Sequence, residues 1–478
     1  MIKRLFLLAT ILLSSFYVFG QKKTNYKPNV IILFADDLGY GDLSCYGAQD
    51  VQTPNIDALA KEGMRFTDFQ VPSSVCSPSR AALLTGRYPM RNGFPVAQHE
   101  GEKHKKYGLH PDEITIADVL LKQKYATMAI GKWHLGFKKG MQPIDNGFQY
   151  FYGLQSNWVK NKSQLKQLYN NREIVQKNVP YESLIKNYTQ KAIDFIETNK
   201  ENPFFLFLAY NSVHSPIIVN KEFIGTSKGS LYGDYVQELD HFVGKLTYVL
   251  TENKLEENTI VIFLSDNGPA ICNFGGSAGS LNGGKYTTME GGFRIPAIIK
   301  WKGKFTKGEN NISLSSMDLL PTIANLIEAE TPTDRVIDGK DITSILTSGK
   351  GKSPHKFLYY YNGANLQAVR KGKWKLHLPR TLKDQPFWSK KMMEKPFKGR
   401  NLKNISCKGL EVLTRPLLFN LDIDMGELTD ISKKHPKVVK ELLLEAVRIR
   451  VELGDVNNVG TDQRVPPFKD IQVKNFEN

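Results

Sequence analysis

The chain has 478 residues, of which 41% are hydrophobic and 23% are charged. This ordinary globular composition supplies enough apolar material for a large core, and it excludes a disordered chain, a collagen-like repeat and a multi-span membrane protein. The formal net charge of +16 favours an anionic partner, such as nucleic acid, an acidic membrane, or a small or polymeric anion. Four cysteines are too few for a disulfide scaffold in a chain of this length.

Residues 1–20 have the features of a secretory signal peptide. Lys3 and Arg4 form a short basic start, residues 5–19 carry no charge, and Gly20 is a small residue before the expected cleavage point. The apolar run is too short for a comfortable transmembrane helix, although an uncleaved anchor is the alternative. We therefore expect an exported protein, periplasmic or secreted, without stable membrane insertion.

Four short apolar runs are each followed by a cluster of polar residues. The runs are residues 30–35, 125–130, 204–209 and 260–264. Continuous apolar runs of this length are typical of strands buried on both faces, as in a parallel sheet covered by helices. Ligands bind such sheets at the carboxyl ends of the strands, so the polar clusters predict an active-site rim at that edge.

Segments with helical spacing of apolar residues lie between these runs. They are residues 114–121, 181–199, 235–250 and 319–326. Another helix is expected to start at Thr53, as N-cap, with Pro54 at its first position, and to end at Gly63. Alternating strands and helices predict an α/β sandwich with a mostly parallel central sheet.

The pattern changes after about residue 350. Strands are predicted at residues 357–361, 368–378 and 418–421, and a final helix at residues 436–453. The second of these strands turns at Lys371 and Gly372. We therefore expect a main α/β domain over residues 21–350 and a smaller C-terminal subdomain over residues 351–478, with an antiparallel sheet and a helix.

Residues 379–416 are basic and irregular, and they include Phe387, Trp388 and Phe397. A solvated surface loop is one interpretation. The other is a substrate-facing flap, because aromatic faces stack on sugar rings and lysines attract anions.

The most informative stretch runs from residue 75 to residue 86. Cys76 precedes Pro78, which suits the first turn of a helix, and Gly86 suits the helix end. Backbone N–H groups at a helix N-terminus favour negative charge, and Arg80 lies one turn further on the same face. A nucleophile beside such a cradle suits a tetrahedral oxyanion ester, whereas a buried structural thiol is the alternative for an isolated cysteine.

Cys76-x-Pro78-Ser79-Arg80, followed by Ala-Ala-Leu-Leu-Thr-Gly-Arg, resembles the signature of the type I sulfatases, in which the cysteine is oxidised to formylglycine. Further motifs similar to those of this family follow in the expected order along most of the chain. They are Asp36-Asp37, Gly131-Lys132-Trp133-His134, His214, Ser265-Asp266-Asn267-Gly268, Lys285, Gly291-Gly292-Phe293-Arg294-Ile295-Pro296, and Leu418-Phe419-Asn420-Leu421 with Asp424 and Gly426. The resemblance implies an alkaline-phosphatase-like α/β/α fold, one calcium ion and hydrolysis of sulfate esters.

The resemblance also implies a metal site. Asp36, Asp37, Asp266 and Asn267, with the group derived from Cys76, would hold the ion. Carboxylate and amide oxygens suit Ca²⁺ or Mg²⁺ rather than zinc, whereas capping and turn formation are the structural alternative for these residues. The ion would polarise the sulfate and lower the pKa of the attacking hydroxyl.

Five basic residues receive roles in the same way. Arg80 and Lys132 would hold the charge of the nucleophile, and His134 would act as base on the second hydroxyl of hydrated formylglycine. His214 and Lys285 would bind sulfate, and one of them would protonate the leaving oxygen. General acid–base help of this kind is worth about 10²–10⁴-fold in rate. Structural hydrogen bonding is the alternative for the histidines, and a surface turn is the alternative for Lys285.

Substrate selection has weaker signals. The positive charge favours a sulfated glycan, such as ulvan, carrageenan or a glycosaminoglycan. Arg91, Asn92, Gln98 and His99 are candidates to line the pocket or to form a surface loop, whereas Cys45, Cys272 and Cys407 are expected to be structural.

The expected partner proteins and the competing functions follow from the same motifs. A formylglycine-generating or sulfatase-maturating enzyme is the implied partner, and nucleic acid is not expected. Two alternatives stay open, a phosphodiesterase or phosphonate hydrolase of the same fold and a catalytically idle polyanion-binding protein.

Overall fold

The computed structural model describes residues 27–98, 107–156, 167–271, 275–381, 412–456 and 458–465. The expected signal peptide, His99, Cys272, Cys407 and the aromatic residues of the 379–416 segment lie outside these ranges. Within the described part of the chain, no helix combines the length and the apolar character needed to cross a bilayer.

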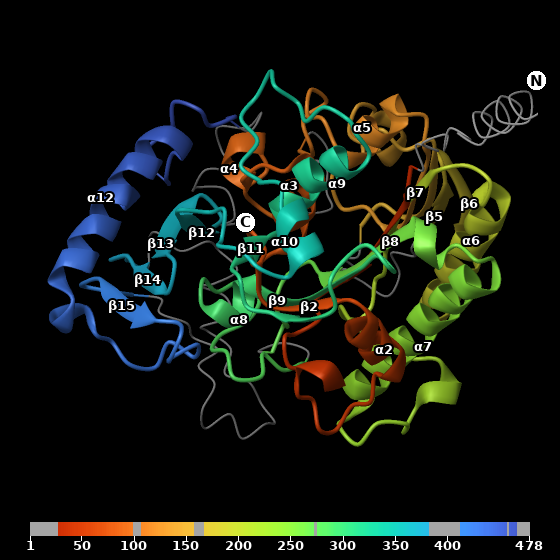
Figure 1. Ribbon diagram of the computed structural model, residues 1–478, viewed down its shortest axis with the longest axis horizontal. Helices are drawn as coiled ribbons and strands as arrows, with labels where there is room; N and C mark the ends of the chain where they lie inside the picture. The colour runs from red at the N-terminus through yellow and green to blue at the C-terminus, as the bar shows by residue number, and fades with distance from the viewer. Residues whose placement is uncertain are drawn as a thin grey trace, which may run out of the picture.

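The centre of the molecule is an eleven-stranded mixed sheet (Figure 1). Its strands run in the order β10-β2-β9-β8-β1-β7-β3-β4-β5-β6, and β11 pairs with β2. Their bounds are β1 Asn29–Ala35, β2 Met64–Gln70, β3 Ala126–Lys132, β4 Tyr150–Leu154, β5 Gln167–Asn170, β6 Glu173–Lys177, β7 Phe204–Ala209, β8 Thr259–Ser265, β9 Arg294–Lys300, β10 Gly308–Asn310 and β11 Leu314–Ser315. The central strands β8, β1, β7, β3 and β4 are parallel, which confirms the predicted α/β class.

Helices cover both faces of this sheet, so the central strands are apolar on both sides. In β1, Val30, Ile32 and Phe34 pack into the layer formed with α3 (Cys76–Thr85), α5 (Ile116–Lys122) and α9 (Leu319–Leu326). The alternate residues Ile31 and Leu33 pack into the layer formed with α2 (Pro54–Glu62), α6 (Leu184–Asn199) and α7 (Leu231–Glu252). The carboxyl ends of the strands are thereby left for polar residues.

Local signals account for most helix bounds. The predicted helix 319–326 matches α9, and α5 begins at Ile116 because Thr115 and Asp118 form a capping box. Residues 181–183 form a short 3₁₀ turn before α6. Thr53 is the N-cap residue of α2, Pro54 is its first residue and Gly63 follows its end, as predicted, although the Thr53 hydroxyl donates to Asp57 and accepts no bond from the helix backbone.

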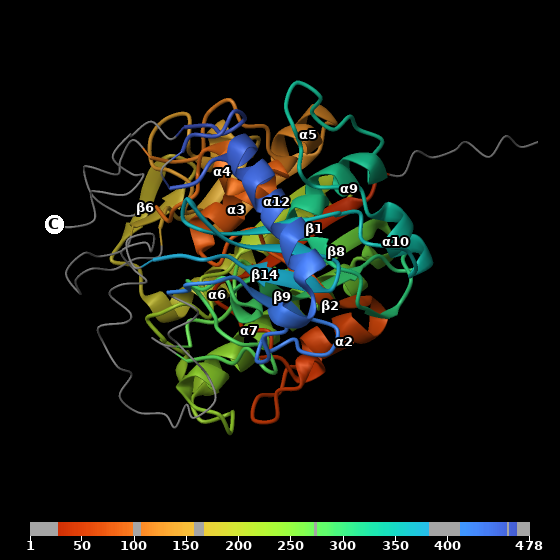
Figure 2. The same cartoon turned by 90° about the vertical axis from the view of Figure 1, so that its left-hand side faces the viewer.

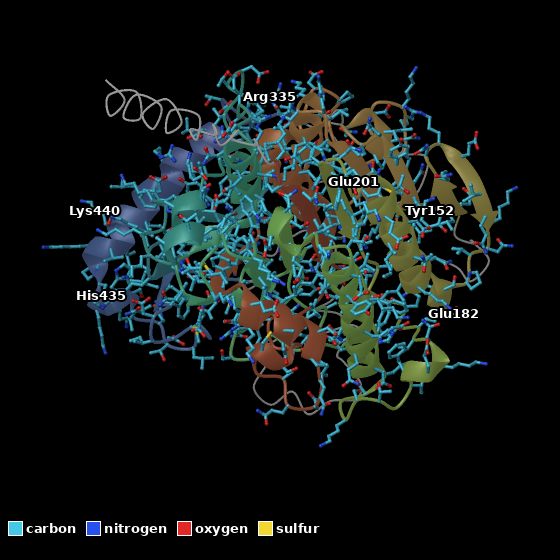
Figure 3. The ribbon with its side chains drawn as sticks, turned by 45° about the vertical axis from the view of Figure 1, so that its right-hand side comes forward. Tyr152, Glu182, Glu201, Arg335, His435 and Lys440 are labelled. Carbon is cyan, nitrogen blue, oxygen red and sulfur yellow. The ribbon has the colours of Figure 1, made fainter. Side chains whose placement is uncertain are left out.

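The predicted C-terminal antiparallel sheet is confirmed. Its strands are β12 (Leu358–Asn362), β13 (Asn365–Lys371), β14 (Trp374–His377) and β15 (Leu417–Asn420), in that order. Helix α12 (Pro436–Leu453) crosses one face of this sheet (Figure 2). It packs through Leu442, Ala446 and Ile449, whereas the exposed Lys440 lies on its outer side (Figure 3).

A buried network of charged and titratable side chains joins the two sheets. It consists of Asp68, Glu290, Arg370, Lys375, His377 and Glu427. Lys375 Nζ lies 2.9 Å from Glu290 Oε1 and 3.1 Å from Glu427 Oε1. Buried charges are tolerated only when they are paired. The charged residues on either side of this contact therefore need the two sheets to be packed together.

His377 makes the stability of this network depend on pH. Burial lowers the pKa of His377 to about 4, from an ordinary value of 6.5. As the pH falls from 6.5 to 4, the unfolded chain therefore binds a proton that the folded chain excludes, and stability is lost over this window. As the pH falls through this window, we expect the difference in unfolding free energy between wild type and His377→Gln to shrink. Urea unfolding from pH 4 to pH 8 measures this difference, and a constant value would contradict the prediction.

Candidate active site

Polar residues meet at the carboxyl edge of the central strands, where the sequence predicted a rim. Asp36 and Asp37 follow β1, and Asp266 and Asn267 follow β8. The other residues that the sequence singled out come to the same place from β3, β7, α3 and a loop before β9. They are Cys76, Arg80, Lys132, His134, His214 and Lys285.

Cys76 opens helix α3, and every residue of this helix is buried. The helix ends at Gly86, whose φ of 67° is a left-handed value that glycine adopts at little cost. Cys76 Sγ lies 3.3 Å from His134 Nδ1. Burial raises the pKa of the Cys76 thiol, so the unmodified side chain is a poor nucleophile at neutral pH.

The orientation of His134 is set by a backbone carbonyl. His134 Nε2 lies 2.9 Å from the carbonyl oxygen of Gln98 and donates its proton to it. Nδ1 is then the acceptor nitrogen, and it faces Cys76. Burial, followed by the charges of Lys132 and Arg80, holds the pKa of His134 well below its usual range, so the neutral form is available to take a proton.

Gln98 has a role that the sequence did not reveal. It is buried, its N–H donates to Ser77 Oγ at 3.1 Å, and its side-chain amide donates to the carbonyl of Tyr107 at 2.8 Å. The side chain is therefore occupied in fixing its own backbone, and the carbonyl orients His134. A role that rests on a carbonyl group has no signature in residue type.

Arg80 and Lys132 are fixed by the aspartates of the site. Arg80 donates to Asp266 Oδ2 from Nε and Nη2, at 3.0 and 2.8 Å, and Lys132 Nζ lies 2.6 Å from Asp36 Oδ2. Burial acts against the charge of Arg80, but Asp266 and Asp36 outweigh it and raise the pKa of Arg80. Two basic side chains thus stand beside Cys76.

The donor set fits a hard divalent cation. Asp36, Cys76 and Asp266 offer ligand atoms that all lie within 4.8 Å of one another. Burial and the neighbouring charge of Asp36 raise the pKa of Asp266 to about 7. Asn267 Nδ2 donates to Asp37 Oδ1 at 2.7 Å, and Asn267 Oδ1 is a buried oxygen without a hydrogen-bond partner among the described residues. Oxygen ligands of this kind suit Ca²⁺ or Mg²⁺.

Lys285 belongs to the site and not to a surface turn. Its side chain is buried, and Nζ lies 2.6 and 2.7 Å from the two carboxylate oxygens of Asp37. Burial opposes its charge, but Asp37 outweighs this effect and holds the pKa of Lys285 well above its usual range. The loop that carries Lys285 continues to Gly291, which packs tightly on the turn after β8. A Cβ at Gly268 in that turn would stand 1.7 Å from the carbonyl oxygen of Gly291, so only glycine fits there.

His214 is the most exposed of the basic residues. Its Nε2 lies 3.7 Å from Asp37 Oδ2, and its side chain is 13% exposed, against 0–2% for Arg80, Lys132 and Lys285. Burial lowers the pKa of His214 to about 4. His214 therefore lies at the solvent side of the cluster.

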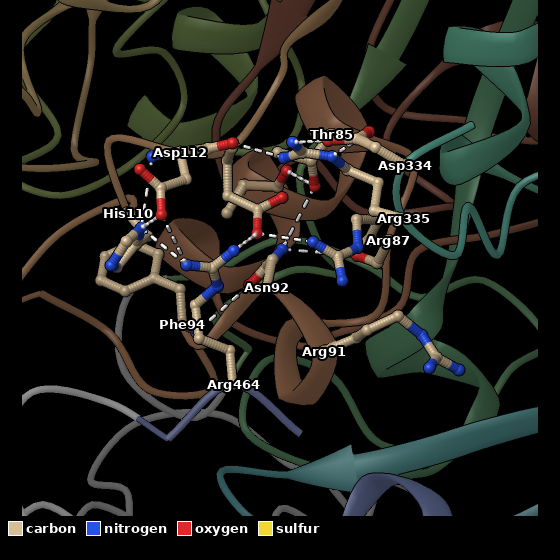
Figure 4. Close-up of polar contacts among 12 residues, drawn as sticks. Thr85, Arg87, Arg91, Asn92, Phe94, His110, Asp112, Asp334, Arg335 and Arg464 are labelled. Carbon is tan, nitrogen blue, oxygen red and sulfur yellow. Dashed lines mark hydrogen bonds and ion pairs between the residues drawn. The ribbon is translucent and has the colours of Figure 1, made fainter. Parts of the chain in front are cut away.

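Arg91 and Asn92, which follow the signature helix, form neither a pocket wall nor a surface loop. The buried guanidinium of Arg91 pairs with Asp338 at 2.9 Å and with two carboxylates of the C-terminal part, Glu452 and Asp462. Asn92 donates to Thr85 Oγ1 at 3.3 Å, beside a network of arginines and acids in which Arg91 takes no part (Figure 4). Asn92 thus contacts the end of α3, whereas Arg91 joins the segment after α3 to the C-terminal part of the chain.

Comparison with known proteins decides the family. The model of the Sulfatase family matches residues 28–329. The chain belongs to the sulfatase family. A second model, described as the C-terminal region of aryl-sulfatase, matches residues 353–468 of this sulfatase. The chain is therefore a sulfuric ester hydrolase, and the sequence prediction of its family is confirmed.

Relatives and solved structures agree with this assignment. The sulfatase is 37% identical over 435 residues to N-acetylgalactosamine-6-sulfatase of Mus musculus, which covers 85% of this chain and 82% of that one. Ps i-CgsB, solved in complex with k-i-k-neocarrahexaose, has a TM-score of 0.76 and 28% identity, covering 92% and 94% of the two chains. A sulfatase structure whose name refers to the metabolism of multiple glycosaminoglycans by Bacteroides thetaiotaomicron has a TM-score of 0.72 and 29% identity. The match covers 89% of this chain and 100% of that one.

Proposed function

We propose that this sulfatase removes sulfate from polyanionic glycans, with formylglycine derived from Cys76 as nucleophile and one Ca²⁺ as cofactor. The observation that carries the proposal is the 3.3 Å contact between Cys76 Sγ and the acceptor nitrogen of His134, beside Arg80, Lys132 and a set of buried carboxylates.

Asp36, Asp37, Asp266 and Asn267 would hold the calcium ion. When bound, the ion supplies a Lewis acid that polarises a sulfate oxygen and lowers the pKa of a neighbouring hydroxyl. Two hydroxyls of the hydrated aldehyde would stand where Cys76 Sγ now lies. His134 Nδ1 is placed to take a proton from one of them, while Arg80 and Lys132 stabilise the negative charge of the other.

Lys285 and His214 act on the ester itself. The permanent charge of Lys285, held beside Asp37, binds the sulfate group. His214 lies further toward solvent than Lys285, and one of these two residues would protonate the leaving oxygen.

The glycan assignment rests on charge, on the N-terminal segment and on two neighbours. The net charge of +16, of which Lys3 and Arg4 of the expected export signal supply only two, attracts polyanions. One similar structure was solved with a carrageenan-type hexaose, and another comes from glycosaminoglycan metabolism. Residues 1–20 have the pattern of an export signal, and this supports an activity in the periplasm or outside the cell, where sulfated polysaccharides occur.

Burial of Cys76 limits when its modification takes place. The residue is 4% exposed in a helix that is buried along its whole length. A formylglycine-generating or sulfatase-maturating enzyme would therefore act on the chain before α3 packs into the core.

Release of inorganic sulfate from a panel of substrates tests the proposed function. The panel holds oligosaccharides of carrageenan, ulvan and glycosaminoglycans, with an aryl sulfate and a phosphodiester for comparison. We expect one class of sulfated oligosaccharide to give the highest kcat/KM and the phosphodiester to give no significant turnover. A preference for the aryl sulfate would contradict the glycan assignment, and no release by fully converted enzyme would indicate an idle polyanion-binding protein.

A further inference from the structure

The loop that carries Lys285 is fastened to two neighbouring parts of the site. The N–H of Lys285 donates to the carbonyl of Pro269 at 2.9 Å, and the N–H of Tyr286 donates to the carbonyl of Ser74 at 3.1 Å. Pro269 lies in the turn after β8, and Ser74 lies just before α3. These bonds hold the N–H groups of the loop but leave the carbonyl of Tyr286 to another partner.

Tyr286, the residue after Lys285, has a φ of 72°. This is a left-handed conformation that residues with a side chain rarely adopt, and it persists only where the surroundings enforce it. If Tyr286 relaxed to an ordinary conformation, the chain direction at Lys285 would change. The position of the Lys285 ammonium group therefore depends on whatever holds both peptide groups of Tyr286.

The second holder is a side chain of the C-terminal sheet. Asn362, the last residue of β12, is 3% exposed, and its Nδ2 donates to the carbonyl of Tyr286 at 3.1 Å. The Lys285 ammonium group also lies 5.5 Å from the centre of the Tyr286 ring, within the range of a cation–π contact. Asn362 is separated from the site in sequence, yet it contacts the residue next to Lys285.

Two further contacts join the C-terminal part of the chain to the same loop. Thr288 Oγ1 donates to Gln367 Oε1 of β13 at 3.0 Å, and the N–H of Glu290 donates to Glu427 Oε2 at 2.6 Å. Both lie beyond Tyr286 in the chain, so they secure the end of the loop that is further from Lys285. Of these three contacts between the C-terminal part and the loop, that of Asn362 is therefore nearest to Lys285.

We propose that Asn362 is a positioning residue for Lys285. Its amide, presented by the C-terminal sheet, holds the Tyr286 carbonyl and so keeps Lys285 Nζ at the place where it contacts Asp37 and faces the sulfate group. The proposal rests on the proposed function, in which Lys285 binds sulfate. It makes the C-terminal sheet a determinant of sulfate affinity in a site built on the other sheet.

Steady-state kinetics of the full-length, fully converted enzyme test this role, with inorganic sulfate as competitive inhibitor. Asn362→Ala and the isosteric Asn362→Asp, assayed at pH 8, both remove the donor. We expect KM and the sulfate inhibition constant to rise together by about 10-fold, the loss of one hydrogen bond, with kcat little changed. A fall in kcat or in thermal stability with unchanged KM and inhibition constant would show a merely structural role and overturn the proposal.

Two control variants separate this proposal from the function on which it rests. Tyr359 lies on the same strand as Asn362, and its hydroxyl donates to Glu445 of α12, away from the loop. Tyr359→Phe removes this hydrogen bond and is expected to leave KM and the inhibition constant unchanged. Lys285→Ala is expected to raise the inhibition constant more than either Asn362 variant. If Lys285→Ala has no effect, the sulfate-binding role of Lys285 is wrong and the proposal fails with it. If Lys285→Ala weakens sulfate binding and both Asn362 variants do not, only the positioning role fails.

Discussion

Cys76→Ala is expected to lower kcat/KM for sulfate release by about 10⁴-fold or more, because loss of a nucleophile removes nearly all of the catalysis that the other site residues support. Arg80, Lys132 and Lys285 keep their carboxylate partners in this variant, so substrate binding is expected to survive. Measurement of sulfate release beside equilibrium binding of a sulfated oligosaccharide separates the two effects.

Cys45→Ala is the matched control for this prediction. Cys45 is a free, half-buried thiol whose pKa burial and the charge of Asp57 raise far above its usual range, and it lies outside the site. We expect full activity from this variant. Activity of Cys76→Ala within tenfold of wild type would show that another group attacks the ester.

Removal of the divalent cation by a chelator is expected to lower the rate by about 10³-fold or more, since a Lewis acid contributes several kcal/mol to such a reaction. Stability falls as well, because the buried carboxylates of Asp36, Asp37 and Asp266 lose the charge that compensates their repulsion. Restoring Ca²⁺ to a hundred times its dissociation constant returns about 2.7 kcal/mol of stability. Thermal unfolding and sulfate release are measured on the same samples.

Two aspartate variants make the metal prediction specific. Asp37→Asn removes one buried carboxylate of the set, and we expect it to weaken Ca²⁺ binding and to need more Ca²⁺ for activity. Asp334→Asn changes an exposed carboxylate that pairs with Arg335, and its Ca²⁺ response is expected to match wild type. Full activity of the wild-type enzyme after chelation, with no metal detected, would contradict the cation site.

The sequence predicted the central part of the fold because its signals are local. Apolar runs mark β1, β7 and β8, which are buried on both faces, and Pro and Gly residues mark the ends of α2 and α3. Strands β5 and β6, of which β6 forms the edge of the sheet, were missed, since β6 is exposed along its whole length and its residues follow no burial pattern. The antiparallel strand β9 was missed as well, because its first residues were interpreted only as part of a motif.

The candidate site was predicted to a similar degree and for the same reason. Residues with ionisable side chains at strand ends were found. Gln98, by contrast, acts through its own backbone carbonyl, and Asn362 donates to the backbone carbonyl of another residue. Contacts of this kind cannot be predicted from residue type. Arg91 illustrates the opposite error. A basic residue after the signature suggested an anion pocket, but its partner Asp338 lies 247 positions further along the chain, and no local pattern reveals such a contact.

Mass spectrometry of the tryptic peptide 66–80 from active protein tests most directly whether formylglycine is the nucleophile. This peptide contains Cys76 and ends at Arg80. We expect the aldehyde in place of the thiol, in a proportion that follows specific activity from one preparation to the next. An unmodified thiol in fully active enzyme would contradict the mechanism.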